Sequence, residues 1–110
     1  MRTRLLLGMA PVLALLAGSA RAGLPVYDLT AVNGTFVPTL LTLPAGQKVK
    51  LEVHNQGPAP EEFESSDLNQ EQVVVPGSTI TLFIGPLQPG TYSFFGDFHP
   101  ATARGRIVVQ

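Results

Sequence analysis

Carboxylates and a single imidazole are the side chains of this sequence whose types and spacing could bind a metal ion. Glu62 and Glu64 stand two residues apart. On a strand both would project from one face and offer two carboxylates to one cation, while Phe63 would turn into the core. Asp97 and His99 lie close together further along the chain. Carboxylates with one imidazole suit iron, Mn, Zn or Cu(II) better than Cu(I), which prefers sulfur.

These residues also have an ordinary structural interpretation. Four of the eight acidic residues fall between Glu61 and Asp67, and acidic clusters are usually a solvated surface edge. A lone histidine such as His99 more often makes a capping or hydrogen-bonding contact at a strand end. In the segment KVKLEVHN, alternation places His54 on the side opposite to the valines. We therefore expect His54 to face solvent and to take no part in a site.

Composition excludes several functions. The chain contains no cysteine, which rules out a thiolate ligand, disulfides and a cysteine nucleophile, and its two methionines, Met1 and Met9, precede residue 23. No Ser/His/Asp arrangement is visible, so we expect a binding protein and not an enzyme. Residues 23–110 carry four basic and eight acidic side chains, a net charge of −4. This balance disfavours nucleic acid as a partner and favours cations.

The first 22 residues have the three regions of a secretory signal peptide. Arg2 and Arg4 precede an apolar run from Leu5 to Ala17, and the small-residue sequence ARA ends at Ala22. The apolar run is shorter than the roughly 20 residues that a membrane helix needs. We expect cleavage after Ala22, no stable membrane anchor after cleavage, and one periplasmic domain over residues 23–110.

The remainder of the chain predicts an all-β sandwich of about seven or eight strands. Short segments rich in β-branched, leucine and aromatic residues recur between glycine and proline punctuation. Pro76-Gly77 and Pro89-Gly90 suit tight turns and favour antiparallel neighbours. Tyr92, Phe94 and Gly96 share the inward phase of one strand. The predicted strands are Tyr27–Val32, Thr35–Leu43, Lys48–Asn55, Glu62–Ser65, Glu71–Val75, Thr79–Ile84, Thr91–Phe95 and Gly105–Val109.

Two long stretches, NGTFVPTLLTLPAGQKVKLEVHNQGPAPEEFES and PLQPGTYSFFGDFHPATARGRIVV, resemble the cupredoxin family of exported, copper-binding Greek-key β-sandwiches. In blue-copper members a histidine, a cysteine, a second histidine and an axial methionine meet at one end of the sandwich. The resemblance places Glu61 or Glu62 at the first histidine, Gly96 at the cysteine, and Thr102 or a neighbour near the methionine. Of the four ligands only His99 remains, so the resemblance implies no blue-copper site.

The segments EFES, PLQPGTY and FFGDFHPATARG are similar to the cupredoxin-like domain of EfeO-type proteins, which are linked to bacterial iron-permease systems. This similarity implies a periplasmic protein that handles iron or Cu(II) beside an inner-membrane iron permease. It also implies that Glu62, Glu64, Asp97 and His99 gather as ligands at one end of the sandwich, although the copper-histidine alignment points to Glu61 instead. The alternative is a metal-free sandwich that kept the fold and serves as an interaction or assembly module.

The signal-peptide assignment predicts a specific mature N-terminus. Ala20 and Ala22 are the small residues that signal peptidase requires, so the exported protein should begin at or near Gly23. Mass spectrometry of the periplasmic protein measures this directly. An exported species that still carries residues 5–17 would contradict it.

Overall fold

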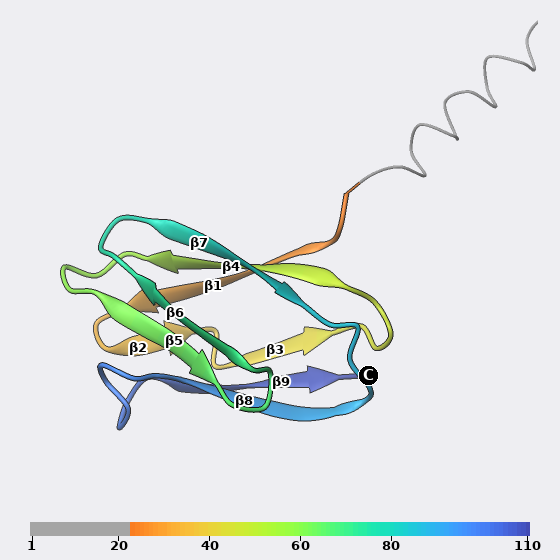
Figure 1. Ribbon diagram of the computed structural model, residues 1–110. Helices are drawn as coiled ribbons and strands as arrows, with labels where there is room; N and C mark the ends of the chain where they lie inside the picture. The colour runs from red at the N-terminus through yellow and green to blue at the C-terminus, as the bar shows by residue number, and fades with distance from the viewer. Residues whose placement is uncertain (1–22) are drawn as a thin grey trace, which may run out of the picture.

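The structure, a computed structural model, describes residues 23–110, and the predicted signal peptide at 1–22 lies outside the described residues. Nine strands form two sheets that pack face to face (Figure 1). Among residues 23–110 there is no apolar helix of a length that could cross a membrane. The strands are β1 (Val26–Val32), β2 (Thr35–Val37), β3 (Leu40–Leu43), β4 (Val49–Asn55), β5 (Glu61–Ser65), β6 (Gln70–Val74), β7 (Thr79–Ile84), β8 (Gly90–Gly96) and β9 (Arg104–Val109).

The predicted all-β sandwich is confirmed, with one strand more than expected. The first sheet has the order β2-β1-β4-β7 and the second the order β3-β9-β8-β5-β6. The predicted strand Thr35–Leu43 is two strands, because Pro38 lacks the N–H that a continuous ladder would use. At this point the chain changes sheets, so β2 pairs antiparallel with β1, whereas β3 pairs parallel with β9.

The prediction that the two Pro-Gly turns join antiparallel neighbours is wrong. Pro76-Gly77 connects β6 to β7, and Pro89-Gly90 leads from β7 into β8, yet in both cases the two strands belong to different sheets. Gly77 does adopt the positive φ, 75°, that such a turn requires. The turn residues therefore specify where the chain reverses, but they do not specify which strand becomes the hydrogen-bonded neighbour.

Alternation along the strands builds the apolar core between the sheets. Val49, Leu51 and Val53 of β4 are fully buried, as their phase predicts. Three phenylalanine rings, Phe36, Phe63 and Phe94, meet with centroids 5.4–6.1 Å apart in edge and stacked contacts, which add to the stabilisation from burial. Tyr92 of β8 packs at the margin of this core. Its hydroxyl donates to the carbonyl of Gln88 at 2.8 Å, as a partly buried tyrosine requires.

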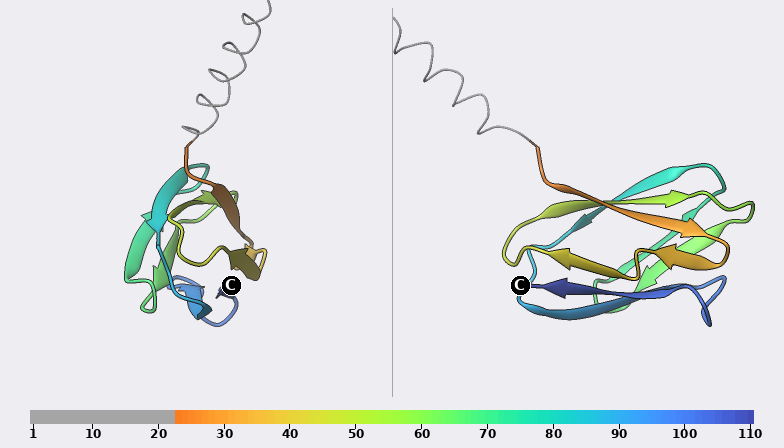
Figure 2. Two further views of the ribbon diagram at one scale, coloured as in Figure 1. Left: turned by 90° about the vertical axis from the view of Figure 1, so that its right-hand side faces the viewer. Right: turned by 180° about the vertical axis from the view of Figure 1, so that it is seen from behind.

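One end of the sandwich brings together four connections, those between β1 and β2, β4 and β5, β6 and β7, and β8 and β9 (Figures 1 and 2). Asn55, the last residue of β4, shapes this end. Its buried amide donates to the carbonyls of Ala59 and Val74 at 2.9 and 2.8 Å, and its Oδ1 accepts the Gly57 N–H at 2.8 Å. The loop that leads from β4 into Glu61 is thereby held against β6.

Candidate functional site

The pleat of β5 divides the predicted ligands into two groups. Glu61, Phe63 and Ser65 point inward and are buried, whereas Glu62 and Glu64 point outward. Successive side chains of a strand point to opposite faces of the sheet. One metal ion therefore cannot bind both Glu61 and Glu62. Of the residues that the resemblance implies as ligands, Glu62, Glu64 and Asp97 lie together, whereas His99 contacts the alternative ligand, Glu61.

Glu61 forms the inner group with His99. Its carboxyl side chain is 5% exposed, and Oε2 lies 2.7 Å from Nδ1 of His99. The other oxygen, Oε1, accepts the backbone N–H groups of Glu62 and Phe98, each at 3.0 Å. A carboxylate can only accept, so Nδ1 of His99 carries the proton. Both oxygens of this buried carboxylate are satisfied, and they tie the start of β5 to the loop between β8 and β9.

Gly96 is the residue that makes room for the Glu61 carboxylate. A Cβ atom at position 96 would lie 2.5 Å from Cδ of Glu61 and 2.7 and 2.8 Å from its two oxygens. Atoms of side chains do not approach so closely, and no side chain at position 96 could share the space with Glu61 in this arrangement. The carboxylate thus occupies the space into which a cysteine at position 96 would extend.

The residues at this end do not fit a blue-copper ion. Gly96 stands where the resemblance places the cysteine of a blue-copper site. The carboxylate of Glu61 fills the space beside Gly96, and its two oxygens already take part in three hydrogen bonds. His99, whose side chain is 42% exposed, directs Nδ1 at Glu61. Beside this pair a pocket of about 280 Å³ is lined by residues from the β1–β2 turn, the β4–β5 loop and the β8–β9 loop, among them Asn33, Pro60 and Thr102.

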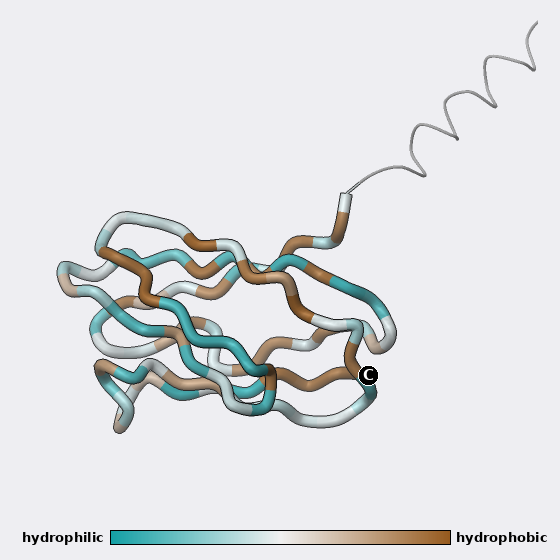
Figure 3. Tube along the Cα trace, in the orientation of Figure 1, coloured by the Kyte–Doolittle hydropathy of each residue, from teal (hydrophilic) through white to brown (hydrophobic). Residues whose placement is uncertain are grey.

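The outer group consists of Glu62, Glu64 and Asp97, which we call the carboxylate patch. One oxygen from each lies within 4.8 Å of the other two. The backbone N–H of Asp97 donates to the carbonyl of Glu62 at 2.9 Å, which fixes the loop after β8 beside β5. Glu71 of β6 stands opposite Glu64 in the antiparallel register. Hydrophilic stretches of β5 and β6 run next to each other in this sheet (Figure 3).

The electrostatics of the carboxylate patch favour binding of a positive charge. Partial burial, the hydrogen bond to Glu71, and the charges of Glu71 and Asp97 together raise the pKa of Glu62 to about 7. Burial and the same two charges also raise the pKa of Glu64. Both carboxyls therefore hold protons more tightly than isolated glutamates do, because burial and the neighbouring negative charges disfavour their ionised forms.

His54 lies on the outer face of β4, as predicted, but it is not an isolated surface residue. Its side chain is 30% exposed, and Nε2 lies 2.8 Å from Oδ1 of Asp28 while Nδ1 lies 2.8 Å from Oγ1 of Thr79. Asp28, Glu52 and His54 form a second group of metal-ligating types. The sequence does not reveal these contacts, because it does not show that β1 and β7 flank β4.

The burial of Glu61 was not predicted, although its signal is present in the sequence. Phe63 indicates the inward phase of β5, and Glu61 lies two residues before it, so the same alternation that buries the ring buries the carboxylate. Glu71 and Asp28 were not considered as members of a site. Their proximity to Glu62 and His54 depends on strand pairing across the sheet, which no local pattern specifies.

Adding a methyl group at position 96 should test the packing of Glu61. We expect Gly96→Ala to lower the free energy of unfolding by about 1–3 kcal/mol, because the Cβ and the carboxylate compete for one space. In a Glu61→Ala background the same change should cost far less, so the two effects should not add. Chemical denaturation of the four proteins of this cycle measures the coupling.

Gly57→Ala is the matched control for the Gly96 variant. The nearest atom to a Cβ at position 57 is Oδ1 of Asn55, at 3.4 Å, an ordinary contact distance. We expect little change in stability from this substitution. Additive effects of Gly96→Ala and Glu61→Ala would contradict the assigned contact.

Comparison with known proteins agrees with this architecture. The model of the cupredoxin-like domain family matches residues 5–109. The protein RP394 of Rickettsia prowazekii (strain Madrid E) is 43% identical over 82 residues, which are 74% of this chain and 66%, just under two thirds, of that protein.

Solved structures of copper proteins share the fold. Auracyanin A, a "blue" copper protein of Chloroflexus aurantiacus, superposes with a TM-score of 0.71 at 16% identity, covering 80% of this chain and 100% of that one. The metal-binding domain of the Cu(I)-exporting ATPase CopA of Streptococcus pneumoniae D39 gives a TM-score of 0.69 at 14% identity, covering 77% and 84%. With a family match over almost its entire length, the chain belongs to the family of cupredoxin-like domains.

Proposed function

We propose that this cupredoxin-like protein is exported to the periplasm and binds iron or Cu(II) at the carboxylate patch, without a blue-copper site. The observation that carries the proposal is the convergence of three carboxylates, Glu62, Glu64 and Asp97, with one oxygen of each within 4.8 Å of the others. Oxygen ligands of this kind suit Cu(II), iron and Mn and do not suit Cu(I).

The ionisation of the patch supports binding of a cation. A bound ion would replace the proton that Glu62 holds and would remove the repulsion among Glu62, Glu64 and Asp97. The patch lies on the outer face of the second sheet, where Glu62 and Glu64 are half-buried and Asp97 is exposed, so within residues 23–110 it is not an enclosed centre. An ion in such a place exchanges readily, which suits carriage and transfer and does not suit electron transfer.

We further propose that the partner which supplies or accepts this ion is an inner-membrane iron permease complex. The support is the similarity of EFES, PLQPGTY and FFGDFHPATARG to EfeO-type domains, together with an acidic stretch of residues that iron prefers as ligands. The signal-like N-terminal segment supports a periplasmic location. The proposed role is binding and delivery, with no catalytic step.

A metal-free interaction or assembly module is the second candidate function. The observation in its favour is the end of the sandwich at which the family's copper would lie, where the carboxylate of Glu61 fills the space and is fully hydrogen bonded. In this case the carboxylate patch would be a solvated surface, and the protein would act through the shape of its loops.

Neutralising two carboxylates of the patch separates these functions. We expect Glu62→Gln/Glu64→Gln to weaken binding of Fe(II) and of Cu(II) about tenfold or more, because each glutamine removes a negative charge and an anionic ligand. Anaerobic titration calorimetry with Fe(II), and aerobic calorimetry with Cu(II), measures the affinity.

The Cu(II) complex should also lack the intense visible band of a copper thiolate, since the chain has no cysteine.

Asp67→Asn is the control for the patch variant. Asp67 lies in the same acidic stretch, but Oδ2 accepts hydrogens from the N–H and the hydroxyl of Ser93, which an amide oxygen can also accept. We expect its affinity for Fe(II) to match that of the wild type. Unchanged affinity for both metals in the double variant would refute the carboxylate patch as the site and favour the metal-free module.

The pKa of Glu62 predicts how the stability of the metal-free protein depends on pH. Its value of about 7 in the folded chain lies above the ordinary value of 4.5, so the folded state holds the proton more tightly than the unfolded state. The free energy of unfolding should therefore fall as the pH rises from about 4.5 to about 7. Denaturation at a series of pH values should show a flatter profile for Glu62→Gln, and a profile identical to that of the wild type would contradict the assignment.

A further inference from the structure

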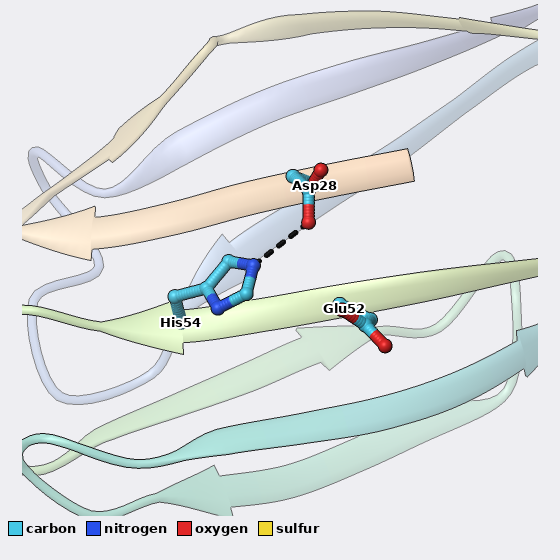
Figure 4. Close-up of side chains that lie close together, drawn as sticks. All are labelled: Asp28, Glu52 and His54. Carbon is cyan, nitrogen blue, oxygen red and sulfur yellow. Dashed lines mark hydrogen bonds and ion pairs between the residues drawn. The ribbon is translucent and has the colours of Figure 1, made fainter. Parts of the chain in front are cut away.

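A group of three side chains on the opposite face of the sandwich combines an imidazole with two carboxylates. Asp28 comes from β1, and Glu52 and His54 come from β4, with one possible ligand atom of each within 4.8 Å of the others. The ring of His54 and the carboxylate of Asp28 point toward one another, and Glu52 stands next along the same strand (Figure 4). This group belongs to the first sheet, whereas the carboxylate patch belongs to the second.

The register of the parallel pair β1 and β4 explains why the three meet. Asp28 stands opposite Glu52, and Thr30 stands opposite His54, so Asp28 is diagonal to the imidazole. Two carboxylates placed directly opposite on neighbouring strands repel one another and lower stability. In the metal-free protein only the hydrogen bond from His54 to Asp28 offsets part of this charge among the three.

Thr79 holds the imidazole from its other side. Residues 54 and 79 are partners in the antiparallel register of β4 and β7, and the hydroxyl of Thr79 lies 2.8 Å from Nδ1 of His54. A hydroxyl both donates and accepts. When Nε2 of His54 carries the proton and donates it to Asp28, the Thr79 hydroxyl can donate to Nδ1. When Nδ1 carries the proton, the same hydroxyl can accept it, and Nε2 is free to bind a metal ion. The ring keeps its orientation in both tautomers.

This is the arrangement that a metal-binding histidine needs. A histidine that binds a metal ion through one nitrogen usually has its other nitrogen fixed by a hydrogen bond to a neighbouring group. Nε2 of His54 is aimed at a carboxylate oxygen of Asp28 2.8 Å away, and one ring nitrogen lies within 4.8 Å of a carboxylate oxygen of Glu52. An ion between them would gain one nitrogen and two oxygen ligands, would leave its remaining positions to water, and would remove the repulsion between Asp28 and Glu52.

We propose that Asp28, Glu52 and His54 form a second metal site, which binds a divalent transition-metal ion, Zn²⁺ or Cu²⁺. The imidazole distinguishes this site from the all-oxygen carboxylate patch, because nitrogen ligands favour Zn²⁺ and Cu²⁺ over Mg²⁺ and Ca²⁺. The proposal does not rest on the function proposed above, since it uses no residue of the carboxylate patch.

Zn²⁺ titration followed by nuclear magnetic resonance of the imidazole nitrogens tests the site. The protein has two histidines, His54 and His99, and the signals of His54 are identified by their loss in His54→Gln. At neutral pH, Zn²⁺ should shift the Nε2 signal of His54 and leave the His99 signals in place. Asp28→Asn/Glu52→Gln should weaken this binding about tenfold or more. A His54 ring that does not respond to millimolar Zn²⁺, or a Zn²⁺ affinity unchanged in that double variant, overturns the proposal.

Glu62→Gln/Glu64→Gln is the charge-matched control, because it also removes two negative charges, but from the other sheet. Its Zn²⁺ affinity at His54 should equal that of the wild type. An equal loss in both double variants would show that net charge alone attracts the ion, and the proposal would then fail. The Fe(II) calorimetry described above reports on the carboxylate patch separately, so failure of one site is distinguishable from failure of the other. Circular dichroism of each variant confirms that its fold is retained.

Discussion

The buried carboxylate of Glu61 is the constraint on which the candidate site depends. Removing an ionised carboxylate from water costs several kcal/mol unless hydrogen bonds replace those of the solvent. Here two backbone N–H groups and the imidazole of His99 supply them. The donors from Phe98 and His99 connect the start of β5 to the loop after β8, two segments that are distant in sequence. The absent side chain of Gly96 makes this possible. Hydrogen bonds from these donors close this end of the fold.

The same strand pleat has a second consequence. Once Phe63 and Glu61 face the core, Glu62 and Glu64 must face outward, so the acidic residues cannot all serve one centre. Any metal chemistry of β5 is therefore displaced from the enclosed end to the outer face of the sheet. On that face water would complete the coordination of a bound ion, and the dielectric constant is high. Such a place suits exchange of a hard cation, and it does not provide the enclosed, sulfur-containing environment that tunes copper for electron transfer.

The sequence predicts the fold and individual strands better than it predicts the site. Val49, Leu51, Val53 and Phe94 follow simple alternation, so their burial could be predicted from a few residues of local sequence. Two features depended on contacts between distant segments and could not. Pro38 ends one strand, but the transfer of β3 to the other sheet depends on its pairing with β9. His54 has a predictable outward phase, but its bonds to Asp28 and Thr79 exist only because β1 and β7 flank β4.

The stability of this domain must come from its core and its hydrogen bonds, because the chain has no disulfide to restrict the unfolded state. The three phenylalanine rings stabilise the core between the sheets, and the buried amide of Asn55 stabilises one end of the sandwich. Both proposed metal sites lie elsewhere, on the outer faces, where like charges oppose one another across paired strands. An ion that binds only the folded state adds to stability in proportion to its binding. Each ion would also join segments distant in sequence, β1 to β4 in one sheet and β5 to the loop after β8 in the other. The core stabilises only the inner face of each sheet. Metal binding on the outer faces would therefore strengthen the contacts between β1 and β4 and between β5 and the loop after β8.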